Sequence, residues 1–453
     1  MSDWNTAEEH VDRALELFRR GRLGEAEQAM RIALSISPDR GDWQFNLALT
    51  LDALGKNEEA IEWYQMAAKA LPEELEVVAS AGIALVKFES FDDGLRLLEQ
   101  ACRLDSSCEE AWAHRIDALA RSNRYEEAEG IYFLAQQYLE DYPNCLYAMG
   151  EALFEKDLTE RAIWCFREAA RQEPTLPRVR ARLASALAAS GRSHRAVRMF
   201  LQELREHPGS METLLDFGDL LIELGRYGEA EEKFKRMLEI NPAETRAHRR
   251  LAEIAMHRGY FEEAVSEFEL VQSLAPDEEN IILPLASALL ATKRTRETRI
   301  LLVDFTEKIL EGHQKELENR ERDDLLQLVD LLLKSGLPGL AGDLCDKKLL
   351  TAPEDIDVLR RLAFAAFDRG DRRTGDRVSR KLLRLDPTLC TVHENLVLSA
   401  IRARKPALAW ARIQRGLNRF PDHEALRRLR TLVLLRRIPG LISRMTRQNT
   451  PQV

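Results

Sequence analysis

Long apolar stretches are missing from this chain of 453 residues. No stretch reaches the roughly 18 uncharged apolar residues that a membrane-spanning helix requires. The N-terminal segment MSDWNTAEEHVDR lacks the basic start and the apolar core of a secretory signal. We therefore expect no transmembrane segment and a location in the cytoplasm.

Cysteine is scarce, and neither glycine nor proline is in excess. The six cysteines are widely spaced and form no Cys-x-x-Cys pair, which fits a reducing compartment rather than a disulfide framework. With 22 glycines, 16 prolines and 45% hydrophobic residues, the composition excludes collagen-like, low-complexity and wholly disordered chains. The chain has enough apolar residues to bury a core.

Motifs that carry a catalytic mechanism are also missing from the sequence. There is no phosphate-binding Walker A loop, no GxGxxG after a strand, no GxSxG and no HExxH. The nine histidines are scattered without ligand spacing, and the nearest pair, His248 and His257, is interpreted as ordinary surface or groove residues. We therefore predict no enzymatic activity, no cofactor and no metal site.

What the sequence does contain is a repeat of 34 residues, which must be recognised before any fold is assigned. Prolines recur at a spacing of 34 or three times 34, except for one gap of 77, which is two periods plus nine residues: they are Pro38, Pro72, Pro174, Pro208, Pro242, Pro276, Pro353, Pro387 and Pro421. A first repeat beginning at Ala7 places every one of these prolines at position 32. This frame predicts twelve repeats, which begin at residues 7, 41, 75, 109, 143, 177, 211, 245, 279, 322, 356 and 390.

Four further positions agree with this frame. Positions 8 and 20 are usually alanine or glycine, and position 24 is often aromatic, so small and large side chains recur at fixed offsets. Position 15 is glycine in seven repeats, where a left-handed backbone can end a helix: Gly21, Gly55, Gly191, Gly225, Gly259, Gly336 and Gly370. Each repeat is therefore predicted to be helix, turn, helix.

These residues resemble the tetratricopeptide repeat (TPR) family from residue 7 to about residue 423. Repeat seven is an example of the pattern, with Phe217, Gly218, Gly225, Tyr227, Ala230, Phe234 and Pro242. The resemblance implies an all-α fold, a right-handed α-solenoid of antiparallel helix pairs. It also implies a concave groove, lined by the first helix of each repeat, that binds extended peptides or partner proteins.

The domain boundaries follow from the same frame. We expect an N-terminal lead at 1–6, repeats one to nine at 7–310, an inserted helical extension at 311–321, repeats ten to twelve at 322–422, a C-terminal capping helix at 423–437 and a loose tail at 438–453. Repeat nine departs from the pattern because Pro284 falls inside its first helix and Thr298 replaces the small residue at position 20. We expect it to be the weakest repeat.

By the resemblance, positions 2, 5, 6, 9, 12 and 13 of each repeat face the groove. Acidic candidates gather in repeats one to four: Asp12, Asp42, Asp52, Glu76 and Asp117. Candidate partner-binding residues follow in repeats six, eight and eleven: Arg178, Arg182, Arg246, Arg249, Arg250, Arg360, Arg361, Phe364 and Phe367. The arginines of repeats six and eight could bind an acidic ligand, or could form salt bridges with the acidic residues of repeat seven.

One TPR subclass binds the C-termini of chaperones through Lys at position 5 and Asn at position 9 of a repeat. This sequence never has Lys at position 5 or Asn at position 9, so we do not predict a chaperone cofactor.

Charge is distributed unevenly along the chain. Residues 356–453 contain 22 basic and 8 acidic residues, a net charge of +14, whereas residues 1–355 contain 44 basic and 68 acidic residues, a net charge of −24. We predict a non-enzymatic scaffold or adaptor with protein or peptide partners, and head-to-tail self-association between unlike ends is possible. Two alternatives stay open: a nucleic-acid-associated repeat protein that uses the basic C-terminal repeats, which the acidic remainder makes less attractive, or a regulatory subunit of an enzyme or envelope-assembly complex.

Overall fold

The computed structural model describes residues 2–311, 322–349 and 352–437. Within these ranges the chain forms 25 α-helices and one 3₁₀ turn and contains no strand. Two compact units make up the chain, Met1–Ile240 and Asn241–Val453, which we call the N-terminal unit and the C-terminal unit.

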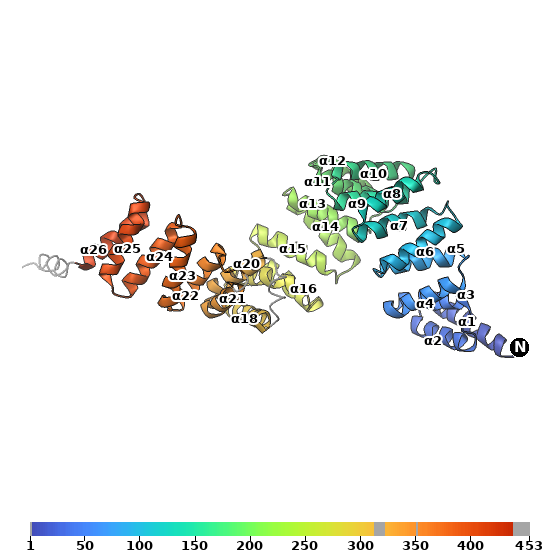
Figure 1. Cartoon of the computed structure of the whole chain (residues 1–453), viewed down its shortest axis with the longest axis horizontal. Coiled ribbons are helices and arrows are strands. Elements are labelled where there is room, and N and C mark those ends of the chain that lie inside the picture. The colour runs from blue at the N-terminus through green and yellow to red at the C-terminus, as the bar shows by residue number, and fades with distance from the viewer. Residues whose placement is uncertain (1, 312–321, 350–351, 438–453) are drawn as a thin grey trace, which may run out of the picture. The chain divides into compact units, whose positions relative to one another are not determined.

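The described part of the N-terminal unit consists of helix pairs that correspond to repeats one to seven (Figure 1). Its first helix begins at Ser2, five residues before the predicted start of repeat one. The helices are α1 (Ser2–Arg19), α2 (Leu23–Ile36), α3 (Gly41–Ala53), α4 (Asn57–Ala70), α5 (Leu75–Lys87), α6 (Phe91–Leu104), α7 (Glu109–Arg121), α8 (Tyr125–Ala135), α9 (Pro143–Glu155), α10 (Thr159–Gln172), α11 (Val179–Ala189), α12 (Ser193–Glu206), α13 (Met211–Glu223) and α14 (Tyr227–Ile240).

The C-terminal unit continues the pattern with repeats eight to twelve and one further helix. Its described helices are α15 (Thr245–Arg258), α16 (Phe261–Leu274), η1 (Glu279–Ile281), α17 (Ile282–Ala291), α18 (Thr295–Glu311), α20 (Arg322–Lys334), α21 (Pro338–Leu349), α22 (Ile356–Asp368), α23 (Arg372–Leu385), α24 (Cys390–Arg402), α25 (Pro406–Arg419) and α26 (Glu424–Arg437). Leu426 and Val433 of α26 are buried against α24 and α25, in the range predicted for a capping helix. The predicted extension at 311–321, apart from Glu311, and the predicted tail at 438–453 lie outside the described residues.

Position 15 has a left-handed backbone in all twelve repeats. The seven predicted glycines have φ between 69° and 85°, and the other five repeats reach φ of 55° to 64° with Glu89, Asn123, Asp157, Lys293 and Arg404. The following residue closes the turn by a backbone hydrogen bond, as Arg22 does to the carbonyl of Leu17 at 2.9 Å. This is the Schellman geometry that satisfies the last carbonyls of a helix.

The two helices of a repeat pack a large side chain against a small one, as the pattern at positions 8, 20 and 24 predicts. The ring of Phe166 in α10 covers Gly150 in α9 so closely that a Cβ at Gly150 would lie 2.6 Å from the ring. Phe234 in α14 covers Gly218 in α13 in the same way two helix pairs further on, and both rings are fully buried. Burying a phenylalanine side chain contributes about 1.5–3 kcal/mol relative to its exposure. The core is therefore a row of similar contacts distributed along each unit.

The turn between repeats is held by side chains that bind the carbonyl of position 32. Gln44, Trp112, His248 and Arg427 each occupy position 4 and donate to the carbonyl oxygen six residues earlier, at 2.7, 3.0, 3.0 and 2.8 Å. His248 is therefore not the surface or groove residue expected from the sequence, because its ring is buried and also contacts Glu267 at 2.6 Å. A proline at position 32 supplies no backbone N–H, but its carbonyl still needs this partner.

Repeat nine begins differently from its neighbours. The 3₁₀ turn η1 precedes α17, which has only ten residues, and Pro284 is the third residue of that helix. A proline fits in the first turn of a helix because no intrahelical N–H is needed there. Thr298 is fully buried, and its hydroxyl donates to the carbonyl of Arg294 at 3.0 Å.

These features confirm the predicted fold class, an all-α solenoid of antiparallel helix pairs, in each unit. None of the described helices combines the length and the apolar character that crossing a membrane requires.

Candidate functional site

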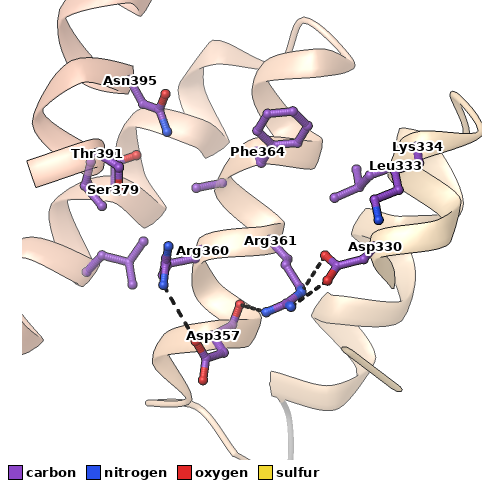
Figure 2. A pocket seen from close by; sticks show the side chains of 13 residues that line it. Asp330, Leu333, Lys334, Asp357, Arg360, Arg361, Phe364, Ser379, Thr391 and Asn395 are labelled. Atoms are coloured by element: carbon purple, nitrogen blue, oxygen red, sulfur yellow. Dashed lines mark hydrogen bonds and ion pairs between the residues drawn. The ribbon is translucent and has the colours of Figure 1, made fainter. Parts of the chain in front are cut away.

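A depression in the C-terminal unit is lined by predicted groove positions of three successive repeats. It has a volume of about 500 Å³ and is formed by α20, α22 and α24 with part of α23. Repeat ten contributes Asp330, Leu333 and Lys334, repeat eleven Arg360, Arg361 and Phe364, and repeat twelve Thr391 and Asn395 (Figure 2). We call this depression the repeat-eleven pocket.

Arg361 is held by an ion pair across the repeat boundary. Its guanidinium donates two hydrogen bonds to the carboxylate of Asp330, at 2.8 and 2.7 Å (Figure 2). The hydrogen bond to Asp330 raises the pKa of Arg361, with burial acting in the opposite direction. These two hydrogen bonds hold α22 against α20.

Arg360 and Phe364 are much more accessible. The side chain of Arg360 is 48% exposed, and its guanidinium lies 3.8 Å from Asp357. Phe364, one turn further along α22, is 53% exposed. Phe367 instead packs on Gly375 in α23, where a Cβ would lie 2.6 Å from its ring. Of the four candidates in repeat eleven, Arg360 and Phe364 are the pair available to a ligand.

Lys334, Thr391 and Asn395 complete the pocket, and the candidate list drawn from the sequence lacks them. Among the described residues, Lys334 has no ion-pair partner within 4 Å. Asn395 occupies position 6 and Lys334 position 13, so the frame places both in the groove. The repeat positions of Lys334 and Asn395 could therefore have identified them, but the candidate partner-binding residues included arginines and aromatic residues alone.

In the N-terminal unit, Arg178 and Arg182 are part of a partly buried ionic cluster. Arg182 donates to Glu151 at 2.6 Å, and Arg178 lies 4.0 Å from Asp216. Burial raises the pKa of both Glu151 and Asp216, although the arginines act to lower it. Tyr147 borders the cluster, and burial raises its pKa to about 12. These arginines already have acidic partners within their own unit.

In the C-terminal unit, Arg246, Arg249 and Arg250 follow one another along α15 and are likewise paired. Arg246 donates to Glu244 at 2.7 Å, and both Arg249 and Arg250 contact Glu253, at 3.1 and 2.8 Å. Arg249 also lies 3.5 Å from Glu278. The two arginine bands predicted from the sequence therefore belong to different units, and each has its own acidic partners.

The acidic candidates of repeats one to four are partly neutralised. Arg40 donates two hydrogen bonds to Asp42, at 2.9 and 2.6 Å, and lowers the pKa of that carboxyl. Asp52 accepts from Lys87 at 2.6 Å, and Asp117 lies 3.6 Å from Arg121. Asp12 and Glu76 are exposed.

Comparison with known families gives the class of this chain. Two models of the tetratricopeptide repeat match it, one at residues 11–74, 80–143 and 181–244 and the other at residues 221–281. Together these ranges cover just over half of the sequence. The chain belongs to the tetratricopeptide repeat family.

Three of the solved structures that resemble this chain come from yeast, Parabacteroides merdae and Pseudomonas aeruginosa. Yeast Tom70 is 13% identical, and the alignment covers 98% of this chain and 99% of that one, with a TM-score of 0.38. A tetratricopeptide repeat protein from Parabacteroides merdae is 15% identical, with coverage of 63% and 99% and a TM-score of 0.45. The pilF protein of Pseudomonas aeruginosa is 17% identical, with coverage of 49% and 100% and a TM-score of 0.37. A search of curated proteins found no match.

Proposed function

We propose that this chain is a non-enzymatic scaffold that binds an extended peptide segment of a partner protein in the repeat-eleven pocket. One observation carries the proposal: groove positions of three successive repeats line a single depression that holds an accessible guanidinium beside an accessible aromatic ring. Arginine and phenylalanine side chains scattered over the surface would not share one depression.

The chemistry of the pocket selects for an acidic and apolar segment. Arg360 can bind a carboxylate through two parallel N–H donors, and Lys334 adds a second positive charge. The ring of Phe364 offers apolar area to a neighbouring side chain of the peptide. Asn395 and Thr391 can exchange hydrogen bonds with the backbone of an extended ligand. The best ligand therefore carries Asp or Glu next to an apolar residue.

A defined peptide library tests this proposal. Fluorescence anisotropy with the full chain would compare extended peptides that contain an acidic–apolar pair with matched peptides in which Lys replaces the acid. We expect binding of the acidic set, and loss of binding in the double variant Arg360→Glu with Phe364→Ala.

The control is Arg428→Glu, because Arg428 is 76% exposed and does not line the pocket. Equal binding of the acidic and the Lys-substituted peptides would contradict the proposal. So would a double variant that binds as well as the unmodified chain.

A second depression supports a different candidate, contact with a nucleic-acid backbone. It has a volume of about 600 Å³ and is lined by six basic residues of α23 and its neighbours, Arg372, Arg373, Arg377, Arg380, Lys405 and Arg412. Asp376 neutralises Arg412 at 2.7 Å and lies 3.8 Å from Arg380, so Arg372, Arg373 and Arg377 carry most of the available charge. Filter binding of single-stranded RNA and duplex DNA at two salt concentrations would show a strongly salt-dependent affinity if this candidate is right.

Location in the cytoplasm is part of the same proposal. The cysteines Cys102, Cys108, Cys145, Cys165, Cys345 and Cys390 are all free, which suits a reducing compartment. Fractionation of cells that produce the chain would test it.

A further inference from the structure

Three side chains with metal-binding chemistry converge at the last repeat. Cys390 is the first residue of α24, Glu394 lies one turn further along that helix, and His423 directly precedes α26. One ligand atom from each of them, a thiol sulfur, a carboxylate oxygen and an imidazole nitrogen, lies within 4.8 Å of the other two.

The repeat explains why these residues meet although 33 positions separate the first from the last. Residues i and i+4 share a helix face, so Cys390 and Glu394 point to the same side of α24. His423 occupies position 34, where the chain returns from α25 and enters α26. Cys390 and His423 are the first and the last residue of repeat twelve, which is why the search for local ligand spacing found no site here.

The imidazole of His423 is incompletely satisfied. Its Nε2 lies 3.3 Å from Glu394 Oε1, and its Nδ1 is buried with no hydrogen-bond partner among the described residues. Buried polar atoms normally have a partner. A bound cation would occupy one ring nitrogen and would hold Glu394 and Cys390 at the same time.

We propose that Cys390, Glu394 and His423 form a binding site for a divalent transition-metal ion, with Zn²⁺ as the best match. Thiolate, imidazole and carboxylate together are the ligand set of zinc sites, whereas Mg²⁺ and Ca²⁺ prefer oxygen alone. Three protein ligands leave a fourth tetrahedral position for water or for a side chain of a partner. The sequence after Glu424 contains no further His, Cys, Asp or Glu.

The neighbouring side chains of His393 and Arg427 are engaged in other contacts. The ring of His393 is packed edge-on against Phe420, with ring centres 5.9 Å apart. Arg427, on the first turn of α26, donates to Asp422 and to the carbonyl of Pro421, so its charge is already paired. A metal ion here would join the start of α24 to the start of α26 and would stabilise the C-terminal end of the array.

The test uses the untagged full chain and Zn²⁺ itself. After reduction, metal removal and equilibrium dialysis against Zn²⁺, we expect one bound ion per chain. Cys390→Ser, Glu394→Gln and His423→Gln should each weaken binding by at least about tenfold. The matched controls His393→Gln and Cys108→Ser should bind as the unmodified chain does.

Substitution with Co²⁺ gives a spectroscopic readout of thiolate ligation. A thiolate-to-cobalt charge-transfer band in the near ultraviolet, absent from the Cys390→Ser spectrum, would support the site. No retained Zn²⁺, or retention that Cys390→Ser leaves unchanged, would overturn the proposal.

Discussion

Arg361 and Asp330 are joined by two parallel hydrogen bonds of 2.8 and 2.7 Å, although they belong to successive repeats. The adjacent Arg360 makes a longer contact, 3.8 Å, with Asp357. Two neighbouring arginines on one helix therefore have different roles. Arg361 links repeats, and Arg360 is the one we propose for ligand binding.

This difference can be measured with two single variants. Arg361→Ala should lower the free energy of unfolding by about 0.5–1 kcal/mol, because the pair is partly exposed and screened by solvent. Arg360→Ala should leave the stability nearly unchanged and weaken binding of acidic peptides. Chemical denaturation and fluorescence anisotropy on both variants would check this, and identical effects of the two substitutions would contradict it.

Packing at position 20 gives a second prediction. Ala230 is fully buried between the helices of repeat seven. Enlarging it to leucine should force α13 and α14 apart and cost roughly 1–3 kcal/mol. Thermal melting of Ala230→Leu would be compared with Glu232→Leu, an exposed position on the same helix. An unchanged melting temperature for Ala230→Leu would show that the repeat frame is misplaced.

Repeat nine should open before its neighbours. Its first helix has only ten residues and begins in a 3₁₀ turn, and Thr298 takes the place of a small residue at the helix crossing. Stability in a repeat array is distributed among neighbours, so a weak repeat is expected to open locally. Hydrogen exchange should therefore be faster in α17 and α18 than in α11 to α16. Uniform protection across these helices would be evidence against it.

Asp355 should make the stability depend on pH. Its carboxylate accepts hydrogen bonds from Arg322, at 2.9 and 3.0 Å, and from the amides of Asp357 and Val358 at the start of α22. The Arg322 contact is the main cause that lowers the pKa of Asp355 from its ordinary value of 3.8. A lowered pKa stabilises the folded chain above the unfolded value, and this contribution is lost as pH falls through the folded value.

Two substitutions separate the charge from the cap. Asp355→Ala should cost about 1 kcal/mol at neutral pH because it removes the N-cap. Asp355→Asn keeps an acceptor for the amides and loses the charge, so it should be less stable than the unmodified chain at neutral pH. That difference should shrink as the pH falls below 3.8. Denaturation curves over this range would reveal whether the gap instead stays constant.

Thiol reactivity should follow burial. Burial raises the pKa of Cys102 to about 11 and that of Cys165 and Cys345 to about 12. These thiols stay protonated and inaccessible at about pH 8, so alkylation of the native chain should spare them. Cys108 is partly exposed and should react first. Mass spectrometry of the labelled peptides would check the order, and equal labelling of Cys102 and Cys108 would contradict it.

The repeat could be predicted from the sequence because every repeat must satisfy the same two local structural constraints. A left-handed residue must end the first helix, and a small residue must meet a large one between the helices, so both constraints recur every 34 residues. Position 15 has a left-handed backbone even in the repeats without glycine, as Lys293 and Arg404 show. The frame also placed Arg360 and Asn395 on the lining of one pocket.

Partner choice among charged side chains could not be predicted. A groove arginine has several acidic residues within reach of its long side chain, and the pairing depends on rotamers and burial. Arg249 pairs with Glu253 and Glu278, which the sequence analysis did not consider. The meeting of Cys390 with His423 was missed for a related reason, because ligand spacing was sought within one helix and not across a whole repeat.

The positive φ at position 15 has a consequence for protein engineering. Glu89, Asn123, Asp157, Lys293 and Arg404 adopt a left-handed backbone, which costs most residues with a Cβ about 1–2 kcal/mol and costs asparagine and aspartate less. Glycine would relieve this strain and would itself lose more chain entropy, by about 0.5–1 kcal/mol. None of the five stands at a groove position, so thermostability can be raised one repeat at a time while the binding face keeps its own residues.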